Sequence, residues 1–153
     1  MHLDGGSMND TTQQTATRLT WAGVIPFIVT AAMGAIGVYA DAALQAFMVY
    51  SAVILSFLGG IHWGLAVRDG ISNVQGRLVI GMVPSLVAWV ALAFLPALIT
   101  LVVLAFFYII WLRYDVQAVT DDWYVKLRKP ATFVVAGTHF LWFISVASER
   151  AML

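Results

Sequence analysis

The chain has 153 residues, of which 61% are hydrophobic and 10% charged, with a mean hydropathy of +0.89. Soluble domains hold roughly 45–50% apolar and about 25% charged residues, so this composition predicts an integral membrane protein with room for one domain. Basic and acidic residues balance at eight each, which gives no indication of a nucleic-acid partner, and the absence of cysteine excludes disulfides and thiolate metal sites.

Residues 1–17 are polar and resemble neither a signal peptide nor a transit peptide. We expect them to form a flexible cytoplasmic tail ahead of a single transmembrane domain over 18–153, and either Met1 or Met8 could be the biological start. The first apolar stretch, at about 19–39, is long enough to cross a bilayer at about 20 residues per crossing.

A second apolar stretch, at about 42–67, ends in the unusual segment SFLGGIHWG. Glycines four residues apart let two helix backbones approach closely in lipid. On a helical wheel one face of this segment is rich in small residues, and we predict that it packs against a partner helix: Ser56, Gly59, Gly60 and Gly64. His62 lies on a different face, so the helix is expected near the centre of a bundle.

The remaining apolar stretches lie at about 78–95, 97–112 and 131–147. The first two are separated by Leu95 and Pro96, which predicts a tight hairpin, with a re-entrant pair as the alternative. Between the last two, residues 113–129 alternate apolar and charged positions at helical spacing, which predicts an amphipathic helix on the membrane surface. Its predicted lipid-contacting side chains are Trp123, Tyr124, Lys126, Arg128 and Lys129.

The basic residues predict the orientation of this chain. With five spans, seven of the eight Lys and Arg residues fall on the side of the N-terminus, and only Arg150 falls on the other. Basic residues concentrate in cytoplasmic loops, so we expect the N-terminus inside and the C-terminus outside. The predicted fold class is all-α: a polytopic transmembrane helix bundle of about five spans with a short surface helix before the last.

Several segments carry a resemblance to a known family: GVIPF, YSAVILSFLGGIHWG, VPSLVAW and WYVKLR. In these the chain resembles the membrane proteins called domain of unknown function 3429, which occur in proteobacteria and, as transmembrane protein 69, in animal mitochondria. The resemblance implies a multi-pass protein of the bacterial inner membrane, and it implies no established activity.

Ionisable groups inside a membrane are candidates for function by default. His62 and His139 fall within predicted spans, and the alternative is that each neutral imidazole simply bonds to a carbonyl or hydroxyl of a neighbouring helix. The full set of candidate ligand or proton-carrying residues is His62, His139, Trp63, Arg68, Asp69 and Asp115. No hydrolase or nucleotide-binding pattern is present, so we predict no catalytic residues, no cofactor and no metal, and an enzyme is the less favoured class.

Three functions remain open. The first is a non-enzymatic accessory or assembly protein of a larger membrane complex or homo-oligomer. The second is a small proton-coupled carrier that uses His62 and His139. The third is binding of a quinone or lipid at the cytoplasmic interface near His62, where an apolar cleft would meet polar groups.

Overall fold

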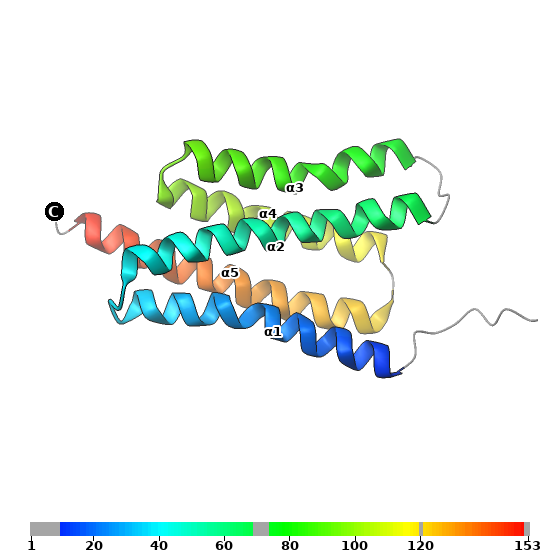
Figure 1. Ribbon diagram of the computed structural model, residues 1–153, viewed down its shortest axis with the longest axis horizontal. Coiled ribbons are helices and arrows are strands. Elements are labelled where there is room, and N and C mark those ends of the chain that lie inside the picture. The colour runs from blue at the N-terminus through cyan, green and yellow to red at the C-terminus, as the bar shows by residue number, and fades with distance from the viewer. Residues whose placement is uncertain (1–9, 69–73, 120, 152–153) are drawn as a thin grey trace, which may run out of the picture.

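The computed structural model describes residues 10–68, 74–119 and 121–151 and shows five α-helices packed side by side in one bundle (Figure 1). Each helix is long and apolar enough to cross a membrane, which confirms the predicted all-α class and number of spans. The helices are α1 (Asp10–Ala35), α2 (Ala40–Arg68), α3 (Val74–Phe94), α4 (Ala97–Ala118) and α5 (Asp122–Ala151). We call the end where α1, α3 and α5 begin and α2 and α4 finish the N-terminal end.

The first helix begins earlier than predicted. Residues 10–17, expected in a flexible tail, already form the first turns of α1. The hydroxyls of Thr15 and Thr17 donate to the carbonyls of Thr11 and Gln13, at 2.9 and 2.8 Å, so these polar side chains are satisfied within the helix itself. Met1 and Met8 lie outside the described residues.

The prediction of a separate surface helix over residues 113–129 is wrong. Helix α4 continues to Ala118, where the Val119 N–H caps it by donating to the Asp115 carbonyl at 2.9 Å, and α5 begins at Asp122 rather than near 131. The segment is therefore divided between two spanning helices. Arg128 was expected to contact headgroups, but it instead meets Asp115 inside the bundle, where each neutralises the other's charge.

The predicted hairpin between the third and fourth spans is present. Helix α3 ends at Phe94 and α4 begins at Ala97, with Pro96 as its N-cap residue. The Thr100 hydroxyl donates at 2.9 Å to the Ala91 carbonyl, which also accepts from the Leu95 N–H at 3.2 Å, so a side chain of α4 is bonded to the last turn of α3. Both helices have the length of full spans, which disfavours the re-entrant alternative.

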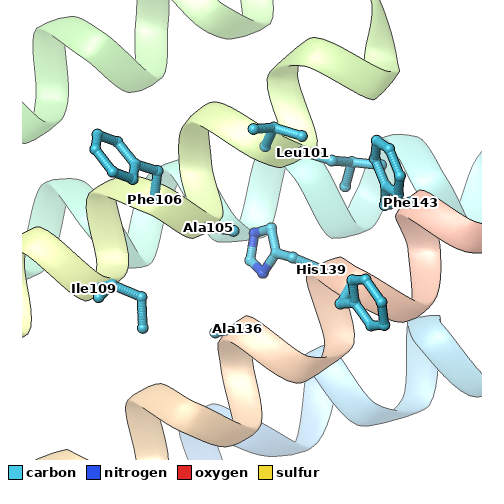
Figure 2. Close-up of a pocket in the computed structure, with 9 residues that line it drawn as sticks. Leu101, Ala105, Phe106, Ile109, Ala136, His139 and Phe143 are labelled. Atoms are coloured by element: carbon cyan, nitrogen blue, oxygen red, sulfur yellow. The ribbon is translucent and has the colours of Figure 1, made fainter.

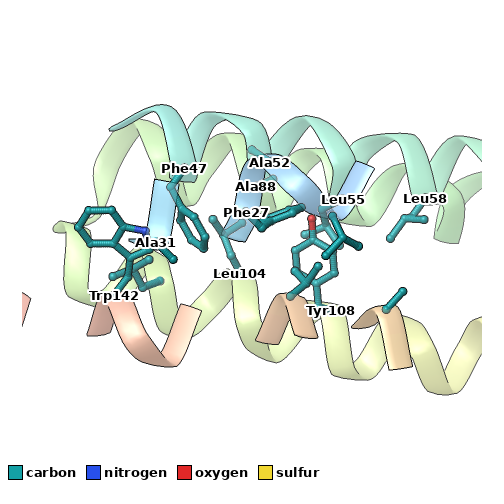
Figure 3. Close-up of a cluster of buried hydrophobic side chains, with 14 of the residues drawn as sticks. Phe27, Ala31, Phe47, Ala52, Leu55, Leu58, Ala88, Leu104, Tyr108 and Trp142 are labelled. Atoms are coloured by element: carbon teal, nitrogen blue, oxygen red, sulfur yellow. The ribbon is translucent and has the colours of Figure 1, made fainter. Parts of the chain in front are cut away.

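The centre of the bundle is an apolar core between the helices (Figure 3). Phe27 and Phe47 meet edge to face with ring centroids 5.5 Å apart, and the Tyr108 ring lies 6.1 Å from Phe27. The Tyr108 hydroxyl donates to the Ser51 carbonyl at 2.8 Å, so this buried phenol is satisfied. The large apolar side chains on the outside are exposed, as expected where lipid covers a bundle.

The predicted small-residue face of α2 is divided between two surroundings. Gly59 of α2 packs directly on Gly81 of α3. The two backbones are so close that a Cβ added at Gly81 would lie 3.1 Å from the Gly59 carbonyl oxygen. Gly60 and Gly64 have open space where a Cβ would be, so no described helix of this chain packs on them and their packing role stays a prediction. Ser56 is half-buried and donates to the Ala52 carbonyl at 2.8 Å. The close approach is thus made by one of the three glycines.

Candidate functional site

A buried carboxylate, Asp115 of α4, collects side chains from two other helices. Its Oδ1 accepts from His62 Nε2 of α2 at 2.9 Å, and its Oδ2 accepts from Arg128 Nε of α5 at 2.6 Å. The Tyr124 hydroxyl lies 3.0 and 2.9 Å from the two oxygens. We call these four residues the Asp115 cluster. It joins α2, α4 and α5 near the N-terminal end of the bundle.

Both oxygens of the Asp115 carboxylate have hydrogen-bond donors within the Asp115 cluster. Asp115 is 1% exposed and Arg128 8%, so both charges are removed from water. Such burial is tolerated when a carboxylate is paired with a cation and its remaining lone pairs accept hydrogen bonds. Because a carboxylate oxygen accepts, His62 donates through Nε2, and its ring packs against both Trp111 and Tyr114 at centroid distances of 5.4 and 4.8 Å.

The structure brings together some of the predicted site residues and separates others. His62 and Asp115, both predicted candidates, are in direct contact. Trp63 is 48% exposed on another side of α2. The backbone of Arg68 ends α2, while its side chain and the whole of Asp69 lie outside the described residues.

Two residues predicted to contact lipid headgroups lie in the cluster instead. Arg128 is buried and Tyr124 is half-buried, and both donate to Asp115. Lys126 and Lys129 are exposed and Trp123 is half-buried, so lipid contact stays a prediction for these three.

His139 belongs to a second polar network deeper in the bundle. Its Nδ1 donates to the Val135 carbonyl at 2.8 Å, and its Nε2 lies 2.8 Å from the Ser51 hydroxyl, which can donate to it. The imidazole therefore uses both nitrogens in hydrogen bonds to a carbonyl and a hydroxyl. This matches the alternative in which a neutral histidine only joins neighbouring helices.

The two histidines are not connected in the part of the chain that the structure describes. Ser51, the partner of His139, lies about 16 Å from His62 along α2 at 1.5 Å per residue. Across the described ranges, no hydrogen bond joins the His139 network to the Asp115 cluster, and no group of three or more His, Asp or Glu side chains could hold a metal ion.

A cleft of about 410 Å³ lies beside the Asp115 cluster, between α1, α2, α4 and α5. Toward the N-terminal end α1 diverges from α2 (Figure 1), and the Tyr50 hydroxyl bonds to the Gly23 carbonyl at 2.9 Å where the two helices are still in contact. Leu19 and Phe57 line the cleft and are 67% and 64% exposed. The cleft therefore opens sideways, toward the lipid around the bundle.

Two residues that line this cleft each have a buried polar atom without a partner in the described part of the chain. Within the described residues, four buried side-chain atoms have no hydrogen-bond partner: Arg128 Nη2, Thr132 Oγ1 and the indole nitrogens of Trp111 and Trp142. Arg128 and Thr132 both line the cleft. Buried polar groups are normally satisfied, so two such residues in the lining of a mainly apolar cleft point to a place where a bound molecule could supply the missing partner.

Sequence reasoning missed Thr132. Tyr124, Arg128 and Thr132 follow one another at intervals of four residues, which places all three on one face of a helix. That spacing was available in the sequence, but the helix was expected to begin only at about residue 131.

A second groove, between α4 and α5, has a different character (Figure 2). It measures about 410 Å³ and is lined by Leu101, Phe106, Phe140 and other apolar residues. His139 forms part of its wall, but the ring nitrogens already bond to Ser51 and Val135. The groove offers an apolar surface suited to a lipid chain and no polar group for recognition.

Comparison with known proteins gives a consistent result. The family described as "Protein of unknown function (DUF3429)" matches residues 12–144. A curated relative, "Transmembrane protein 69" of Xenopus tropicalis, is 34% identical over 125 residues, which cover 78% of this chain. The match covers 49% of the relative, so the chain spans about half of that protein's length. No solved structure matches.

Proposed function

The chain belongs to the DUF3429 family of proteins of unknown function, and we propose that this multi-pass membrane protein binds an amphipathic molecule of the lipid phase in the cleft beside the Asp115 cluster. The observation that carries the proposal is a mainly apolar cleft lined by Arg128 and Thr132, whose buried atoms Nη2 and Oγ1 have no hydrogen-bond partner among the described residues. A molecule with an apolar tail and a polar head fits both features.

We test this proposal by filling the cleft. Thr20 is half-buried and lines it, so Thr20→Phe places a ring where the ligand would lie. Val29→Phe on the same helix is the matched control, because Val29 is 49% exposed and does not line the cleft. Native mass spectrometry of the purified chain should show a co-purifying lipid or quinone that Thr20→Phe loses and Val29→Phe keeps. Equal retention by both variants would place the molecule elsewhere.

A second candidate function is that of an accessory or assembly protein, and the open face at Gly60 and Gly64 favours it. Among the described residues, none comes within 4 Å of a Cβ position at either glycine, so a helix of another protein or of a second copy can approach α2 there. Gly64→Leu should weaken such an association, and Val79→Leu on α3, at a position that is 68% exposed, is the control, because Val67 shares the face of the two glycines. Cross-linking in native membranes followed by mild-detergent purification measures the effect.

The carrier alternative has less support. A relay through both histidines needs a continuous path, but His62 and His139 bond within separate networks of the described chain. We retain the bacterial inner membrane, with the N-terminus in the cytoplasm, as the proposed location. It is supported by the family resemblance and by the exposed basic residues Arg18, Arg113, Lys126 and Lys129 toward the N-terminal end.

A further inference from the structure

We propose that the molecule in the cleft presents an uncharged carbonyl oxygen to Arg128 and Thr132, so that it is a neutral long-tailed carbonyl compound and not an anionic lipid. This inference rests on the proposed function and names the chemistry of its ligand. A quinone and a neutral lipid ester both have the required head, and the experiment below distinguishes them.

The unpartnered atoms define what the head must do. Arg128 Nη2 carries hydrogens and has no acceptor capacity, while a threonine hydroxyl can donate or accept. Both atoms are covered by neighbouring atoms, so the two side chains must turn toward a ligand before one of its oxygens, with two lone pairs, can accept from both. Thr132 is 1% exposed and Arg128 8%, so both donors lie in the interior, where an unmade hydrogen bond is costly. The head is therefore a hydrogen-bond acceptor.

The charges decide between an ionised and an uncharged acceptor. Arg128 bears one positive charge, and its Nε already bonds to the Asp115 carboxylate at 2.6 Å. Among the described residues that line the cleft, no other Lys, Arg or His is present to balance an anion. A carboxylate or phosphate bound there would add a second negative charge beside Asp115 in a site of low polarity, which is unfavourable. An uncharged carbonyl satisfies the donors and keeps the site neutral.

The rest of the cleft fits the tail of such a compound. Beyond Arg128 and Thr132 its walls include Val24, Phe27, Ile54 and Leu58, and its outer rim includes Leu19 and Phe57. A ligand can therefore place its head on α5 and extend its tail between α1 and α2 into the bilayer. This arrangement lets it exchange with the membrane sideways without crossing the headgroup region.

A matched set of probes tests the inference on the full chain in detergent. Hexadecane, methyl palmitate and palmitate share a chain and differ in the head, and a decyl-substituted benzoquinone supplies the quinone head. We expect methyl palmitate or the benzoquinone to bind at least tenfold more tightly than palmitate, measured by native mass spectrometry at a pH where palmitate is ionised. Whichever of these two carbonyl probes binds more tightly shows whether the natural head is a lipid ester or a quinone.

Variants at Thr132 separate recognition of the head from folding. Thr132→Val keeps the shape of the side chain and should weaken the preferred carbonyl probe about fivefold, the effect of one hydrogen bond, while leaving hexadecane unchanged. Thr132→Ser keeps the hydroxyl and should restore affinity. Helix content and elution volume on gel filtration check that each variant folds.

The outcomes separate the inference of an uncharged carbonyl head from the proposed function of ligand binding in the cleft. If palmitate binds as tightly as its methyl ester, or if Thr132→Val does not change the binding of any carbonyl probe, the uncharged-carbonyl inference is overturned while the cleft remains a binding site. If no probe binds and Thr20→Phe changes nothing that co-purifies, the proposed function itself is overturned.

Discussion

At the scale of single residues, the fold contains a buried carboxylate, although aspartate side chains are usually exposed to water. Asp115 is 1% exposed, and side chains from α2 and α5 bond to it. The sequence indicated His62 as a candidate because ionisable groups in apolar helices are rare, and it indicated Asp115 only as a possible ligand in the segment after the fourth predicted span. It did not indicate Arg128 as their partner, since an arginine beside two lysine residues resembles a headgroup-binding cluster.

Removing the negative charge should destabilise the protein strongly. In Asp115→Asn, Arg128 stays buried without a counter-ion, and breaking a buried ion pair in this way costs about 3–5 kcal/mol. Asp41→Asn, at an exposed position in the first turn of α2, should change the free energy of unfolding by less than about 0.5 kcal/mol. Denaturant unfolding in detergent micelles measures both variants.

A double variant shows whether the pair itself is responsible. Asp115→Leu with Arg128→Met removes both charges, so its loss of stability should be smaller than the sum of the two single losses. Simple additivity would mean that the two side chains act independently of each other.

At the scale of helices, close packing depends on glycines at particular contacts. The Trp142 ring of α5 lies directly where a side chain at Gly34 of α1 would be. Gly59 and Gly81 make the corresponding contact between α2 and α3. By contrast, Gly137 of α5 faces open space. Sequence spacing alone gave no way to tell these two classes of glycine apart, because the neighbouring helix was unknown.

Alanine substitutions should separate the two classes. Gly34→Ala forces the Trp142 ring to move and should destabilise the fold by about 1–3 kcal/mol, the usual effect of overpacking. Gly137→Ala adds a methyl group to open space and improves helix propensity, so it should be neutral or stabilising by up to about 1 kcal/mol. Thermal unfolding in one detergent compares them, and equal effects would contradict the contact described for Gly34.

At the scale of the whole molecule, the five spans could be predicted from hydropathy, since apolar stretches of sufficient length leave few alternatives in a membrane. The hairpin at Pro96 could also be predicted, because proline and the combined length of the two stretches required a turn. The boundary between α4 and α5 could not. Periodic apolar positions over residues 113–129 fit a surface helix as well as two helix ends, and the Asp115–Arg128 contact that decides between them is a tertiary one.

The bundle also predicts which loops share one side of the membrane. Tyr39 and Leu95 lie in connections at the end opposite the N-terminal end, and Asp121 lies in the α4–α5 connection. The chain contains no cysteine, so single cysteines can be introduced at each position. We expect a membrane-impermeant thiol reagent added to intact cells to label Tyr39→Cys and Leu95→Cys and to leave Asp121→Cys unlabelled. Labelling of Asp121→Cys together with protection of the other two would reverse the proposed orientation.

The Asp115–Arg128 pair has a consequence for biosynthesis. Asp115 and Arg128 are 13 positions apart in sequence and belong to consecutive helices. As α4 leaves the ribosome its carboxylate has no counter-ion, and an unpaired aspartate in an apolar segment opposes insertion into the bilayer. The first turns of α5 deliver the guanidinium shortly afterwards. Helices α4 and α5 are therefore expected to enter the membrane together, as a hairpin whose buried charges are already paired, so that the buried carboxylate does not meet lipid alone.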